Sequence, residues 1–259
     1  MTLAVEREGA GPPLVLLHGW ALHSGVWGGV RERLAARRTL HLIDLPGHGR
    51  NAHIAPANDA AGLAAQVLAV APPRAAWLGW SLGGAVALAA ALAAPARIER
   101  LALTAATPRF VQAEGWPAAQ TDAAVARFEA RLRDDRDGVV RDFLALQVLG
   151  DEHAQATLHA LKRSVLDGRA PSTEALAAGL AVLHATDLRA AAPSLAVPLL
   201  GMSGTMDRLT PPAALEWLCR SVPDGRHLAI AKAGHAPFLS HPDAFCLAVE
   251  GFLDARHAA

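Results

Sequence analysis

Three residues of the types that perform nucleophilic catalysis lie directly after apolar runs of this chain. Ser81 is at the centre of a Gly-x-Ser-x-Gly motif at 79–83, and an alanine-rich stretch follows it. Asp207 and His235 come after two later apolar runs. A serine hydroxyl is a weak nucleophile that needs a base, and the base needs an acid to orient it. These residues therefore predict a catalytic triad of Ser81, His235 and Asp207 that transfers an acyl group.

The choice of His235 among twelve histidines depends on its position in the chain. His241 is the competitor nearby, but its Ser-His-Pro context indicates the start of a helix. His235 instead lies in a loop just past an apolar run. Active sites of open α/β sheets assemble beyond the carboxyl ends of the strands, so this position favours His235 as the base.

Acyl transfer also needs hydrogen-bond donors for the oxyanion of the tetrahedral intermediate. One candidate is the backbone N–H of Leu82, at the N-terminus of the helix expected directly after Ser81. The other is the backbone N–H of Trp20, in the loop after the first long apolar run. The indole of Trp20 can pack in the core at the same time, because backbone and side chain act separately.

The elements that must position these residues alternate between strands and helices. Continuous apolar runs indicate strands that are buried on both faces of a parallel sheet. We expect strands at 14–17, 40–43, 75–78, 101–103, 198–202 and 227–230. We expect helices between them at 26–36, 59–69, 82–94, 212–219 and 244–253. The alternation predicts the α/β fold class, with a doubly wound and mostly parallel sheet.

The alternation stops between 108 and 186, where no strand-like run occurs. We expect only helices there, at 122–133, 139–149, 152–166 and 172–183. Gly138 and Gly168 are expected to separate helices of this stretch. The sequence thus predicts a core formed by 1–107 and 187–259, with 108–186 inserted as an all-helical cap.

Composition narrows the class of protein further. The 259 residues are 52% hydrophobic, and 24 basic residues balance 24 acidic ones, which argues against a general nucleic-acid or membrane-surface binder. The first residues lack a basic segment followed by an apolar one, so we expect no signal peptide and a cytoplasmic protein. Cys219 and Cys246 suggest no disulfide framework. We expect no metal ion and no cofactor.

Several motifs resemble the α/β-hydrolase superfamily: His-Gly-Trp at 18–20, Asp-Leu-Pro-Gly-His-Gly at 44–49, Gly-Trp-Ser-Leu-Gly-Gly at 79–84 and Gly-His-Ala-Pro-Phe at 234–238. Longer stretches resemble the family of pimeloyl-acyl-carrier-protein methyl ester esterases of biotin synthesis, at 77–84, 143–147 and 231–238. This resemblance runs nearly end to end. It implies the α/β-hydrolase fold and a carboxylesterase that releases methanol and pimeloyl-acyl carrier protein.

The resemblance also implies that acyl carrier protein is the partner and that basic residues of the cap recognise it. The stretch 108–186 holds nine Arg or Lys and eleven Asp or Glu residues, so recognition would depend on a local patch. The candidate contacts are Arg141, Lys162 and Arg163. Aromatic residues could line a channel for the acyl chain or simply pack the cap on the core: Trp20, Trp80, Phe110, Trp116, Phe128 and Phe143.

The triad leaves other activities open. A broad short-chain carboxylesterase, a perhydrolase and a C–C bond hydrolase can all use Ser81, His235 and Asp207 in the same roles. A serine at this position excludes the dehalogenase and epoxide-hydrolase chemistry that an aspartate nucleophile would perform. The alternative from another class is a non-catalytic protein that keeps the pocket to bind a ligand.

Overall fold

The sheet that organises the molecule is visible in a computed structural model, which describes residues 2–166 and 170–255. Within these residues seven strands pair in the order β1-β3-β2-β4-β5-β6-β7. Their bounds are β1 Val5–Glu8, β2 Pro13–Leu17, β3 Thr39–Ile43, β4 Ala75–Trp80, β5 Ile98–Thr104, β6 Leu199–Gly204 and β7 Gly225–Ile230. All neighbours are parallel except β1 and β3. The predicted α/β fold class with a mostly parallel sheet is confirmed.

Among the described strands, the edge strand β1 is the one that no apolar run predicts. Its residues are Val-Glu-Arg-Glu, and it pairs antiparallel with β3. The strand is not enclosed on both faces, because three of its four residues are half-buried and one is exposed. Glu6 and Glu8 both form ion pairs with Arg31 on the neighbouring helix. A short strand held by charges has no continuous apolar run to reveal it.

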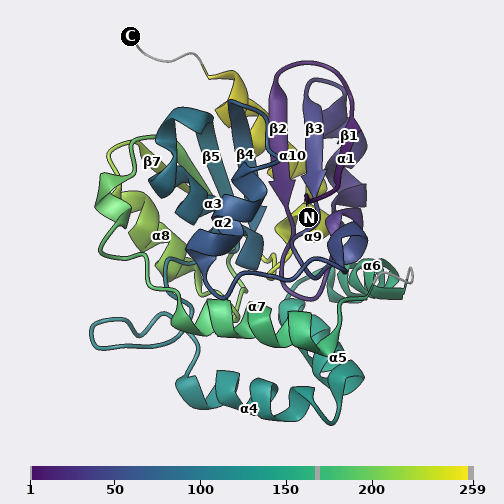
Figure 1. The fold of residues 1–259 in the computed structure, drawn as a ribbon. Helices are drawn as coiled ribbons and strands as arrows, with labels where there is room; N and C mark the ends of the chain where they lie inside the picture. Colours follow the sequence, from purple (N-terminus) through teal and green to yellow (C-terminus); the bar gives the residue numbers. More distant parts are fainter. Residues whose placement is uncertain (1, 167–169, 256–259) are drawn as a thin grey trace.

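Helices cover both faces of the sheet, as a doubly wound fold requires (Figure 1). The core helices are α1 Gly28–Ala35, α2 Ala60–Leu68, α3 Leu82–Ala93, α8 Pro212–Ser221, α9 Pro237–Ser240 and α10 Pro242–Asp254. Helix α3 packs on β4 and on α2, whereas α1 packs on α9 and α10. Among the described residues, no helix is both long enough and apolar enough to cross a membrane.

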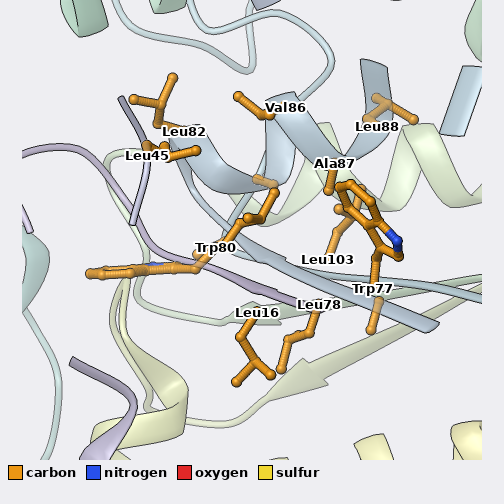
Figure 2. Packing of buried hydrophobic residues seen from close by; sticks show 14 of the residues in the cluster. Leu16, Leu45, Trp77, Leu78, Trp80, Leu82, Val86, Ala87, Leu88 and Leu103 are labelled. Carbon is orange, nitrogen blue, oxygen red and sulfur yellow. The ribbon is translucent and has the colours of Figure 1, made fainter. Parts of the chain in front are cut away.

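The central strand β4 is completely buried and carries side chains to both layers. Trp77 lies beside Ala87 and Leu88 of α3, whereas Leu78 lies with Leu16 on the other side of the strand (Figure 2). The indole of Trp80 packs against Phe238 of α9, with ring centroids 5.0 Å apart. This two-sided burial explains why β4 reads as a continuous apolar run.

Four further helices lie together beyond one end of the sheet, the end toward which the arrowheads of β2 and β3 point (Figure 1). They are α4 Asp122–Leu132, α5 Arg136–Gln147, α6 Ala154–Leu166 and α7 Thr173–Ala185. Gly138 does not separate two helices as expected. The Asp135 side chain accepts a hydrogen bond from its amide, so α5 begins at Arg136 and Gly138 lies in its first turn. Gly168 lies outside the described residues.

The two chain segments that lead into and out of this helical group are joined at their borders. Arg109 and Asp187 form an isolated antiparallel bridge, and their side chains form an ion pair of 2.7 Å. Hydrogen bonds from Arg189 and Arg109 hold the pKa of the Asp187 carboxyl well below its usual range. The division into a core at 1–107 and 187–259 and a cap at 108–186 stays a prediction, and we use the word cap for these four helices and their connections.

The close approach of α3 to β2 gives a test of the packing. An added Cβ at Gly83 would lie 2.4 Å from the His18 carbonyl oxygen and 2.5 Å from that of Leu17, both backbone atoms that cannot swing away. We expect Gly83→Ala to lower the free energy of unfolding by about 1–3 kcal/mol, as overpacking does. Urea unfolding followed by circular dichroism measures this change.

Gly251 provides the matched control, because it lies within α10 and an added Cβ would meet nothing within 4 Å. Alanine is the better helix former, so Gly251→Ala should raise the free energy of unfolding by about 0.5–1 kcal/mol. Equal stability of the Gly83→Ala variant and the unmodified chain would contradict the packing described.

Candidate active site

Ser81 lies at a sharp turn between β4 and α3. Its φ of 55° and ψ of −118° place a non-glycine residue outside the regions that L-residues prefer. Backbone hydrogen bonds hold this conformation: the Ser81 amide donates to the Thr104 carbonyl, and the Ser81 carbonyl accepts from Gly84 and Ala85. A strained serine between a strand and a helix is the geometry that presents a nucleophile in this type of motif.

His235 and Asp207 are brought together as the sequence predicts. Nδ1 of His235 lies 2.8 Å from Oδ2 of Asp207, and the two side chains are 1% and 0% exposed. Because the carboxylate can only accept, the proton of a neutral His235 ring is on Nδ1. Nε2 is then left with a lone pair that can take a proton. Within the described residues this nitrogen is buried and has no hydrogen-bond partner.

The Asp207 carboxylate is held by donors that motif spacing did not reveal. The amides of Leu209 and Thr210 donate to Oδ1 at 2.9 Å and 3.0 Å. The Thr210 hydroxyl donates to Oδ2 at 2.7 Å and lies 3.4 Å from Nδ1 of His235. A buried carboxylate is costly unless such donors surround it. The segment 207–210 therefore orients the acid of the candidate triad.

Trp80 connects two segments of the site. One is the serine turn, at Ser81 between β4 and α3, and the other is the histidine loop, residues 231–236 between β7 and α9. Its indole N–H donates to the His235 carbonyl at 2.9 Å, and the two rings lie 5.7 Å apart. The indole thus sits behind His235 and against Phe238. Trp80 precedes Ser81 directly, so this contact fixes the imidazole relative to the serine turn.

The two candidate oxyanion donors come from the start of α3 and from the loop after β2. Leu82 is the first residue of α3, where the N–H groups of a helix have no partner within the helix. Trp20 follows β2, in a loop that His18 holds by an Nδ1 contact to the Gly19 carbonyl at 2.8 Å and by accepting the Leu45 amide at Nε2. Burial lowers the pKa of His18, so its ring is neutral at pH 7 and can accept this amide. The oxyanion role of Trp20 and Leu82 stays a prediction.

The cap holds the histidine loop directly, which sequence reasoning missed. The Gln147 carbonyl accepts the His235 amide at 2.8 Å. Oδ2 of Asp151 accepts the Gly234 amide at 2.7 Å. The side-chain amide of Gln147 is itself buried and without a hydrogen-bond partner among the described residues. Only tertiary contacts of this kind could have identified Gln147 and Asp151.

The aromatic residues predicted to line an acyl channel lie in different parts of the structure. Trp20 and Phe143 meet edge to face with ring centroids 4.7 Å apart, and the Trp20 indole donates to the Leu176 carbonyl of α7. Trp116 packs against Trp217 of α8 instead. Two other candidates, Phe110 after β5 and Phe128 on α4, make no ring contact with the triad among the described residues.

A cavity of about 580 Å³ lies between α5, α6 and the loop after Trp20. Its apolar lining includes Ala21, Val140, Leu144 and Val165. Two of the three candidate carrier contacts, Arg141 and Lys162, line the same cavity, and so do Arg136 and the acidic Asp137. Arg163 lies on α6 outside this lining. None of the three candidate contacts forms a salt bridge with another described residue.

A nucleophile turn between strand and helix, followed in the chain by an acid and a histidine beyond two later strands, defines the α/β-hydrolase class of protein. The alpha/beta hydrolase fold family model matches residues 12–242, and the chain belongs to this family.

Relatives of known name are similar to this chain over nearly its whole length. The pimeloyl-acyl-carrier-protein methyl ester esterase of Stenotrophomonas maltophilia is 44% identical over 253 residues, which are 96% of this chain and 95% of the relative. The esterase of the same name from Edwardsiella ictaluri is 45% identical over 94% of this chain and 93% of its own. An esterase from Exiguobacterium antarcticum superposes with a TM-score of 0.87, covering 98% of this chain and 96% of that one. Its 23% identity supports the shared fold alone.

The Thr210 hydroxyl gives a test of how the acid is positioned. We expect Thr210→Val to lower kcat about tenfold, because a hydrogen bond to a charged group contributes about 1.5–3 kcal/mol. KM should stay unchanged if the hydroxyl acts only through Asp207 and His235. Steady-state kinetics with p-nitrophenyl butyrate across a pH series measures both constants, and the pH profile of kcat should move with the variant.

Thr210→Ser restores the hydroxyl and should restore kcat. Thr39→Val is the matched control, because the Thr39 hydroxyl donates only to the Gly11 carbonyl at the start of β3. Full activity and an unchanged pH profile in Thr210→Val would show that the hydroxyl does not hold the triad.

Proposed function

We propose that the chain is a serine carboxylic ester hydrolase that removes the methyl group from pimeloyl-acyl-carrier-protein methyl ester in biotin synthesis. The observation that carries this proposal is the likeness to esterases of that name over 94–96% of the chain, which includes the cap. The core alone would support only the hydrolase class, because many activities share this fold. A cytoplasmic location belongs to the same proposal.

The contact between His235 and Asp207 supports the following reaction. Nε2 of His235 takes the proton of Ser81 while the Ser81 oxygen attacks the ester carbonyl. Asp207, 2.8 Å from Nδ1, keeps the ring in the tautomer with a free Nε2 and stabilises the imidazolium that forms. The bond to the methoxy group then breaks, and His235 returns the proton so that methanol leaves.

The second half of the reaction removes the acyl group from Ser81. Water attacks the acyl-enzyme carbonyl while His235 takes its proton. The bond to the Ser81 oxygen then breaks, His235 returns the proton to that oxygen, and the pimeloyl group leaves with a free carboxylate. In both halves the amides of Leu82 and Trp20 are the proposed donors to the oxyanion. The strained turn at Ser81 supports this role, because Leu82 directly follows the nucleophile at the first position of α3.

The cavity beside Trp20 supports a carrier-linked substrate. Its walls are apolar at Val140, Leu144 and Val165, as the methylene chain of an acyl group requires. The charges of Arg141 and Lys162 at the same cavity suit the acidic carrier protein that the resemblance implies. We propose that the carrier docks here, with the cations acting mainly on the rate and orientation of encounter.

The substrate comparison tests this proposal. We expect methyl pimeloyl-acyl carrier protein to be hydrolysed with a kcat/KM at least about tenfold above those of free methyl pimelate and p-nitrophenyl butyrate, because one tenfold step needs only ~1.4 kcal/mol of docking free energy. Methanol release measures all three reactions, and Ser81→Ala is the inactive control. Equal or faster hydrolysis of the small esters would support a broad short-chain carboxylesterase instead.

Charge reversal on the cap separates carrier docking from chemistry. The double variant Arg141→Glu, Lys162→Glu should raise KM for the carrier-bound ester about tenfold and leave p-nitrophenyl butyrate hydrolysis unchanged. Arg127→Glu makes the same kind of charge change on the exposed face of α4 and should affect neither substrate. An unchanged KM in the double variant would place the carrier elsewhere on the cap.

A further inference from the structure

A second cluster of chemically competent side chains lies outside the candidate triad. Glu152 and His153 directly precede α6, and His241 is the residue before α10. One ligand atom from each lies within 4.8 Å of the others, and this is the single such group of three among the described residues. Helix α6 packs against α9, so the cluster joins the cap to the core (Figure 1).

The distances within the cluster suit a single metal ion. Oε1 of Glu152 lies 3.0 Å from Nε2 of His241 and 4.0 Å from Nε2 of His153. Ligand atoms of a tetrahedral zinc site lie roughly 3.3 Å apart, as follows from metal–ligand distances of about 2.0–2.1 Å. The two observed distances bracket this value. His153 is 55% exposed and can turn toward the other two without disturbing the core.

A hydrogen bond to the Nδ1 of His241 orients its ring so that Nε2 can bind a metal ion. Nδ1 lies 2.8 Å from the Ser240 hydroxyl, which can accept its proton. A histidine that binds a metal through one nitrogen usually donates from the other in this way, and the partner fixes the ring. In the metal-free protein Nε2 lies 3.0 Å from Oε1 of Glu152. A divalent cation would lie between these two atoms.

Glu152 is held in place by the histidine loop. Its amide donates to the Lys232 carbonyl at 3.1 Å, and Oε2 accepts from the Lys232 ammonium at 3.0 Å. Hydrogen bonds from His241 and Lys232 lower the pKa of Glu152, so the carboxylate is ionised at neutral pH. Lys232 occupies one oxygen and leaves Oε1 facing the imidazoles. The positive charge of Lys232 repels a cation bound at Oε1, so Lys232 should weaken the affinity for a metal ion.

We propose that Glu152, His153 and His241 bind a divalent transition-metal ion of the Zn²⁺ class. Imidazole nitrogens and one carboxylate oxygen are the donors that such ions prefer, and water would fill the remaining position. The bound ion ties the start of α6 to the start of α10. It therefore stabilises the junction through which the cap holds the loop of His235. This site is independent of the proposed esterase function.

Metal binding is tested on the full, untagged chain after treatment with a chelator. Titration with Zn²⁺ should give one saturable site by calorimetry and a rise in Tm, because an ion that binds only the folded state stabilises it. Bound Co²⁺ should give the visible absorption of a tetrahedral site. His153→Ala and His241→Ala should each weaken binding at least about tenfold and remove the rise in Tm.

Three further variants distinguish a specific metal site from nonspecific binding of Zn²⁺ by surface histidines. His53→Ala is the matched control, because His53 is exposed and belongs to no cluster, and it should bind Zn²⁺ as the unmodified chain does. Ser240→Ala should weaken binding about tenfold through loss of the outer hydrogen bond. Lys232→Gln should tighten binding, because it removes the opposing charge. Equal affinity in the unmodified chain, His153→Ala and His241→Ala would overturn the proposal, as would the absence of a saturable site.

Discussion

The strained backbone at Ser81 is the constraint on which the rest of the site depends. A non-glycine residue with a positive φ costs of order 1–3 kcal/mol and persists only where its surroundings enforce it. Here the surroundings are β4, which is buried along its whole length, and α3, which packs directly on it. An added Cβ at Gly79 would lie 2.6 Å from the Gly83 carbonyl oxygen, so the strand and helix touch backbone to backbone. This contact holds the serine turn beneath the cap.

The histidine loop depends on the serine turn, on the acid and on the cap at once. Trp80 and Asp207 hold His235 from the core, and the Gln147 carbonyl holds its amide from the cap. The cap therefore contacts the loop of His235 directly. A metal ion at the start of α6 would strengthen the same junction, because Glu152 follows Gln147 in the loop after α5. The cap is thus part of the proposed machinery, even though it carries none of the triad residues.

Much of this fold could be predicted from sequence, because parallel strands that are buried on both faces have continuous apolar sequences. The strand before Ser81 is the clearest case, since all six of its residues are buried. The edge strand at Val5–Glu8 was missed because its pairing depends on β3 and on charge pairs with Arg31, neither of which leaves a local pattern. The candidate triad was recognisable from chain order, but the donors that hold it were not. Thr210 and Asp151 act through contacts that exist only after the chain has folded.

Reaction with a fluorophosphonate, followed by intact-mass measurement, tests the role of Ser81 most directly. The serine oxygen displaces fluoride from phosphorus, so an activated serine gains one phosphonyl group. We predict a single addition to the unmodified chain, located on the peptide that contains Ser81 and absent from Ser81→Ala. An unmodified chain that stays unlabelled, or a Ser81→Ala variant labelled to the same extent, would contradict the assignment of Ser81 as the nucleophile.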